Sequence, residues 1–150
     1  MRGMRVVGST LVAAMMLVMG ASVTIAQDAE EPRTDAIEWH RDIDEAKKIA
    51  RDTGRPMLIF VTMQNCRYCT EMKQTTWVDP EMIKDTNESF VATYLDESQN
   101  RELVRSLGIR SFPTTLLATP DGRVREMVRG YVGASNLRNR MSNLHDSLLR

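Results

Sequence analysis

The segment from Pro56 to Met63 limits the possible folds of this chain more than any other. Its sequence, Pro-Met-Leu-Ile-Phe-Val-Thr-Met, is a continuous apolar run rich in residues that favour strands. A strand with one solvated face would alternate apolar and polar residues, so a continuous run indicates that both faces are buried. We therefore predict that this segment is a central strand of a sheet.

Helices are predicted on both sides of this strand. Apolar residues at helical spacing indicate a helix over 42–53, with Asp42 or Asp44 as its cap and Gly54 at its end. A second helix is predicted from Cys66 to Lys73. Three more helices are expected, one after Asp79-Pro80, one over 100–107 before Gly108, and a last one that Ser135 would cap, with Leu137, Met141, Leu144 and Leu148 on one face. Asn65 is the predicted cap of the helix that begins near Cys66.

Three further strands complete the predicted sheet. One covers residues 90–95, and two others, over 114–118 and 124–128, flank Asp121-Gly122, which is a strong hairpin signal. Helices and strands therefore alternate along the chain until a hairpin and a final helix. This order indicates an α/β fold in a single domain over residues 37–150.

The only two cysteines of the chain, Cys66 and Cys69, lie where the central strand gives way to a helix. A thiol in the first turn of a helix meets unpaired N–H groups and the positive end of the helix dipole, which lower its pKa. We predict that Cys66 attacks a disulfide and that Cys69 resolves the mixed disulfide, a reaction that needs no cofactor. Arg67, Tyr68 and Lys73 are expected to modulate the pair, and both cations favour the thiolate.

Other uses of the cysteine pair fit the sequence less well. A structural disulfide would close too small a loop to remove much entropy from the unfolded chain. Zinc would need four ligands, and only His40 and His145 remain, each isolated in the sequence. Several methionines are candidate copper ligands, although most are expected to pack in the core: Met57, Met63, Met72 and Met82.

Residues 1–26 have the pattern of an export signal peptide. A basic start with Arg2 and Arg5 precedes the apolar stretch 6–20, and small residues end at Ala26. We predict cleavage there, although residues 6–26 are just long enough to form an uncleaved membrane anchor. Residues 27–36 are acidic and polar, and we predict that they form a flexible leader.

Cleavage would leave a protein of nearly balanced charge. The chain has 20 basic and 20 acidic side chains, and the signal contains two arginines and no acid, so 18 basic side chains would face 20 acidic ones. This balance gives no attraction to nucleic acid. The remaining strong apolar run, 57–63, is too short to span a bilayer. We therefore expect a mature protein that does not span the membrane and resides in the periplasm or another extracytoplasmic space.

Several motifs in the same order resemble the thioredoxin superfamily, over about residues 37–145. They are Ile37-Glu-Trp39, Gly54-Arg-Pro56, Cys66-Arg-Tyr-Cys69, Trp77-Val-Asp-Pro80, Leu107-Gly-Ile109 and Ser111-Phe-Pro113-Thr-Thr115. Within the superfamily, the chain is similar to exported domains such as the soluble C-terminal domain of the bacterial membrane thiol–disulfide interchange protein. The resemblance implies a three-layer fold with a mixed four-stranded sheet and an extra N-terminal helix.

The same resemblance implies how a substrate would bind. It implies a cis peptide bond before Pro113, beside the cysteines, with the flanking backbone available to pair with an extended substrate. Phe112 would then shape the substrate groove.

The sequence departs from the superfamily at three positions. Phe60 stands six residues before the first cysteine, where an aspartate often assists the resolving thiol, Thr93 is assigned to the position of the supporting lysine, and Asn65 replaces a tryptophan. Without a buried carboxylate, and with nearby cations, the thiolates and hence the reduced form are stabilised. We therefore expect a redox potential above thioredoxin's value of about −270 mV.

The predicted function is thiol–disulfide oxidoreduction, either reduction or interchange, in exported proteins. The expected partners are protein thiols and disulfides, and a membrane protein is a candidate electron donor. Two alternatives belong to other functional classes. One is a non-catalytic binding or chaperone module with the same fold, and the other is a cysteine-based copper-delivery protein.

Overall fold

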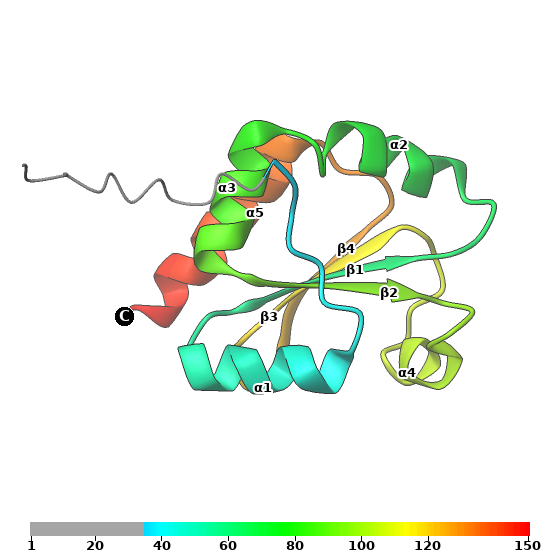
Figure 1. The fold of residues 1–150 in the computed structure, drawn as a ribbon. Coiled ribbons are helices and arrows are strands. Elements are labelled where there is room, and N and C mark those ends of the chain that lie inside the picture. The colour runs from blue at the N-terminus through cyan, green and yellow to red at the C-terminus, as the bar shows by residue number, and fades with distance from the viewer. Residues whose placement is uncertain (1–34) are drawn as a thin grey trace, which may run out of the picture. The chain divides into compact units, whose positions relative to one another are not determined.

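The computed structural model describes residues 35–150, so the predicted signal peptide and residues 27–34 of the predicted leader lie outside the described residues. Along the described chain, the elements are α1 (Ile43–Thr53), β1 (Met57–Thr62), α2 (Arg67–Thr75), α3 (Pro80–Ser89), β2 (Val91–Asp96), α4 (Arg101–Ser106), β3 (Thr114–Ala118), β4 (Val124–Arg129) and α5 (Ala134–Leu148). Figure 1 shows the strands as one sheet between helices. No helix in this part of the chain is both long and apolar enough to cross a bilayer.

The sheet has the predicted four strands, in the order β2-β1-β3-β4. β1 runs parallel to β2 and antiparallel to β3, and β3 and β4 form the predicted hairpin. β1 therefore has a neighbour on each side, and all six of its residues are buried. The predicted central strand and the thioredoxin-like α/β fold are both confirmed.

The two faces of β1 explain why its sequence does not alternate. Leu58 and Phe60 pack on one face, in a core cluster with buried residues of α2, α3 and α5. Met57, Ile59 and Val61 pack on the other face, with buried residues of α1 and α4. Figure 1 shows these two groups of helices on opposite sides of the sheet. A strand covered on both faces needs apolar residues at every position.

Helix ends differ from the prediction at two caps and one apolar position. Asn65 does not cap α2, because its φ of 54° is left-handed, whereas a capping residue needs an extended backbone, as Cys66 has. Ser135 lies inside α5, and Gly133 holds the capping position. Leu148 was predicted on the apolar face of the last helix but is 39% exposed. It lies one turn beyond Leu144, the last residue of α5 in the core cluster. At α1, Asp42 is the cap, as predicted.

Three functional segments emerge at one end of the sheet. Val61, near the end of β1, pairs with Leu95 of β2 and with Thr114, the first residue of β3. The loop with the cysteines follows β1, the segment with α4 follows β2, and Pro113 directly precedes β3. This register brings together segments that are far apart in the sequence.

Candidate active site

The two cysteines occupy different environments at the start of α2. They form a disulfide with a Cα–Cα distance of 5.2 Å. Cys66 is the N-cap of α2 and is partly exposed, whereas Cys69 is only 1% exposed and belongs to the core. The backbone N–H of Cys69 donates to Sγ of Cys66 at 3.1 Å. The more exposed cysteine is therefore also the one whose sulfur a helix N–H can stabilise as a thiolate.

The segment before β3 lies at the same end of the sheet as this pair. The predicted cis peptide bond joins Phe112 and Pro113. Pro113 is buried, and Phe112 and Cys66 both pack, partly buried, against the same core cluster. The carbonyl of Pro113 accepts from the N–H of Gly130 at 2.8 Å, and the Ser111 carbonyl accepts from the Thr114 hydroxyl at 2.7 Å. These two bonds hold the segment against the sheet.

Phe112 has a free backbone edge. Neither its N–H nor its carbonyl bonds to another backbone group within residues 35–150. An extended chain laid along this edge would therefore find a donor and an acceptor at the end of the sheet where Cys66 lies. This arrangement fits the substrate-binding role that the resemblance implied for Phe112 and Pro113.

The predicted modulating residues lie in two places. Arg67 and Tyr68 are exposed on the first turn of α2, and 55% of the Tyr68 surface is accessible. The Lys73 ammonium lies 5.2 Å from the centre of the Tyr94 ring, which also contacts the Arg41 guanidinium at 3.9 Å. Lys73 thus extends toward β2, so the structure gives this cation aromatic and acidic neighbours that the sequence analysis did not identify.

Asp96, at the end of β2, is the acidic neighbour of Lys73. Its pKa lies below the usual range, chiefly because the Ser98 hydroxyl donates to its carboxylate. Partial burial acts in the opposite direction, while the Ser98 backbone N–H and the charges of Lys73 and Arg41 lower the pKa further. The positive charge of Lys73 therefore acts on the Asp96 carboxylate.

An aromatic cluster lies on the sheet face covered by α2. Phe60 is fully buried, and its ring centre lies 6.1 Å from Trp39, 5.2 Å from Trp77 and 5.7 Å from Tyr94. Trp39 and Trp77 are the two tryptophans of the chain, and each belongs to a motif that resembles the superfamily. This shared membership is the sequence signal that could have placed both in one site.

The assignment of Thr93 to the supporting position is wrong. Thr93 pairs with Ile59, whose side chain packs on the other face of the sheet, against the cluster that includes α1 and α4. The residue paired with Phe60 is Tyr94. Paired residues of parallel strands share a face, and side chains alternate along a strand. An aromatic pair thus occupies the place where the superfamily often has an ion pair.

Most of the four methionines considered as copper ligands are buried, as the sequence predicted. Met57, Met72 and Met82 have no exposed surface, whereas Met63 is 41% exposed. Three of the four candidate copper ligands are thus packing residues. Within residues 35–150, no group of three or more His, Cys, Asp and Glu side chains is arranged to hold a metal ion.

Comparison with known proteins gives the same fold. The sequence profile of the thioredoxin-like domain family matches residues 43–145, which is more than half of the chain. This chain belongs to the thioredoxin-like domain family. Its matched region includes the cysteine pair and the Phe112-Pro113 segment.

Solved thioredoxin-like structures superimpose on this member of the family. A thioredoxin from Thermus thermophilus is 18% identical to this chain. The superposition covers 73% of this chain and 87% of that thioredoxin, with a TM-score of 0.66. A DsbH oxidoreductase is 17% identical, and its superposition covers 71% of this chain and 83% of the DsbH chain, with a TM-score of 0.62. The oxidised C-terminal domain of Neisseria meningitidis DsbD is 20% identical, and its superposition covers 70% of this chain and 97% of that domain, with a TM-score of 0.57. At these identities, the similarity concerns the fold.

A curated relative is much longer than this chain. An uncharacterised protein of Caenorhabditis elegans is 26% identical over 105 residues. The match covers 65% of this chain and 14% of that protein.

Proposed function

We propose that this thioredoxin-like protein is a thiol–disulfide oxidoreductase that reduces or interchanges disulfides in exported proteins. The observation that supports it most directly is the asymmetry of the pair, with a partly exposed Cys66 sulfur at the start of α2 bonded to a buried Cys69. The free backbone edge of Phe112 beside the pair supplies a place for an extended substrate. A buried structural bridge would need neither feature.

The reaction transfers two electrons in two exchange steps. In the reduced protein, the Cys66 thiolate attacks one sulfur of a partner disulfide, which breaks that S–S bond and releases one partner thiolate, to be protonated by solvent. Cys69 then loses its proton and attacks Sγ of Cys66, which expels the second partner thiolate. The partner ends as two thiols, and the protein ends with the Cys66–Cys69 disulfide. A thiol protein of the membrane is the proposed donor that reduces this disulfide again.

The absence of a carboxylate at position 60 affects the second step. The Cys69 thiol lies in an apolar core with Phe60 and Met72, and an apolar environment disfavours the thiolate. Proton release from Cys69 must therefore rely on solvent, on the substrate or on the departing thiolate. We expect the resolving step to be slower than in a protein with a buried base.

We also propose that the protein is exported and processed after Ala26. The support is the basic start, the apolar stretch and the small residues that precede Gln27. N-terminal sequencing of protein from an extracytoplasmic fraction should begin at Gln27. A membrane-bound product that keeps residues 1–26 would instead show a tethered domain.

Insulin reduction tests the proposed activity. With dithiothreitol as the source of electrons, the wild-type protein should accelerate precipitation of the insulin B chain, and Cys66→Ser should not, because the attacking sulfur is missing. Arg125→Gln is a matched surface control, since Arg125 is exposed on β4. If wild-type protein gives no acceleration over dithiothreitol alone, the chain is a binding module with an idle cysteine pair.

A further inference from the structure

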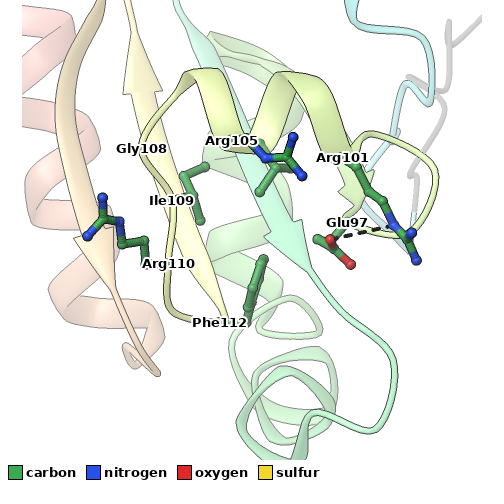
Figure 2. Close-up of a pocket in the computed structure, with 8 residues that line it drawn as sticks. Glu97, Arg101, Arg105, Gly108, Ile109, Arg110 and Phe112 are labelled. Atoms are coloured by element: carbon green, nitrogen blue, oxygen red, sulfur yellow. Dashed lines mark ion pairs between the residues drawn. The ribbon is translucent and has the colours of Figure 1, made fainter.

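A pocket of about 250 Å³ adjoins the Phe112 segment. α4 and the loop after it form most of its wall, and the lining residues include Glu97, Arg101, Arg105, Arg110 and Phe112. Figure 2 shows Arg101 and Arg105 extending from α4 and the Phe112 ring pointing toward that helix. Arg110 extends on the other side of its loop.

The pocket wall carries more positive than negative charge. Three arginines face one acid, Glu97, whose carboxylate lies 3.8 Å from Nε of Arg101. Arg105 and Arg110 are exposed and make no ion pair with any residue of 35–150. An unpaired guanidinium has donors arranged to bind a carboxylate through two parallel hydrogen bonds. The mature chain is not basic overall, so this charge is local.

The pocket and the cysteines lie at the same end of the sheet. The N–H of Glu97 donates to the carbonyl of Thr62, the last residue of β1, at 2.8 Å. Cys66 follows Thr62 after a short loop, and Phe112 contacts both core clusters while lining the pocket. A polypeptide that lies along the backbone edge of Phe112 would therefore present a neighbouring side chain to the arginines.

We propose that this pocket binds acidic side chains next to the target cysteine, so that the preferred substrates are polypeptides with Asp or Glu flanking the disulfide. This inference rests on the proposed oxidoreductase function and names its substrate class. Arg105 is the principal contact, because Arg101 is shared with Glu97. Charges at the rim of a binding surface act mainly on the association rate and on its dependence on salt.

Two matched peptide pairs test this proposal. The first pair carries a mixed disulfide and differs only in having Glu or Gln beside the cysteine, and it reports exchange rates with the reduced protein. The second pair has Ser in place of the cysteine and a fluorescent label, so it reports binding by anisotropy without any redox step. At low ionic strength, we expect the Glu peptides to react and bind about three- to tenfold better than the Gln peptides. Near 1 M salt, where the Debye length is about 3 Å, this preference should disappear.

Variants identify the pocket as the source of the preference. The double variant Arg101→Gln/Arg105→Gln should bring the Glu-to-Gln ratio close to one, and Arg105→Glu should favour the Gln peptide. Glu97→Gln should raise the ratio, because it frees Arg101. Arg125→Gln is the control, because Arg125 lies near the start of β4, at the opposite end of the sheet from the pocket. The Glu-to-Gln ratio of this variant should equal that of the wild type.

The outcomes separate the two proposals. Exchange with equal rates for Glu and Gln peptides, or a preference that survives in the double variant, would overturn the acidic specificity while leaving the oxidoreductase intact. Binding that favours Glu without any exchange would overturn the oxidoreductase and keep the acidic site. Equal binding of both labelled peptides would also overturn the acidic site.

Discussion

Cys69→Ser is expected to accumulate a covalent complex in which Cys66 remains bonded to a partner cysteine. In the proposed reaction, Cys69 attacks Sγ of Cys66 and releases the partner within one exchange step. Serine cannot perform this attack, so the mixed disulfide should persist until an external thiol cleaves it. Non-reducing electrophoresis of extracts from cells that express the variant, with mass spectrometry of the trapped bands, measures this result.

Cys66→Ser should trap no partner and should lose exchange activity by on the order of 10³ or more, as expected when a covalent nucleophile is removed. The remaining thiol, Cys69, is only 1% exposed and cannot approach a protein disulfide. If Cys66→Ser forms the complexes and Cys69→Ser does not, the roles are reversed. The half-exposed position of Cys66 would then have no part in the attack.

Phe60→Ala is expected to lower the free energy of unfolding by about 3–5 kcal/mol. Phe60 has no exposed surface, and its ring contacts Trp39, Trp77 and Tyr94, so alanine would leave a cavity between β1 and α2. Urea denaturation measures the change. Both proteins are held in the disulfide form, so that a difference in redox state does not enter the comparison.

Tyr68→Ala is the matched control for this experiment. It also removes an aromatic ring, but 55% of Tyr68 is exposed, so the expected change is within about 0.5 kcal/mol. A Phe60→Ala change as small as that of Tyr68→Ala would show that the buried aromatic cluster contributes little to the stability of the fold.

The sequence predicted the fold well because its strongest patterns have direct physical causes. Continuous hydrophobicity identified β1 as the central strand, and Asp121-Gly122 located the hairpin between β3 and β4. The errors in the predicted helix caps came where several neighbouring residues are suitable capping residues by type. Asn65 is a good capping residue by type, but its left-handed backbone excludes that role.

For the candidate site, the sequence located the cysteine pair and the Phe112-Pro113 segment, but not the residues around them. The cysteine pair and the Phe112-Pro113 segment are local motifs, whereas the partner of Phe60 depends on the pairing of β1 with β2, which sequence spacing does not give. Thr93 was assigned to that place, and the register puts Tyr94 there instead. The arginine pocket was missed for a similar reason. Arg101, Arg105 and Arg110 look like ordinary surface charges until α4 and the loop after it are placed beside Phe112.

The redox potential of the Cys66–Cys69 pair tests the central claim most directly. We expect the reduced form to be favoured by the Cys69 N–H, which donates to Sγ of Cys66, and by Arg67 between the cysteines. Equilibration of the protein in glutathione and dithiothreitol buffers, followed by alkylation and mass analysis, should show reversible two-electron titration above thioredoxin's value of about −270 mV. A pair that stays oxidised below about −300 mV would behave as a structural disulfide and would contradict the proposed function.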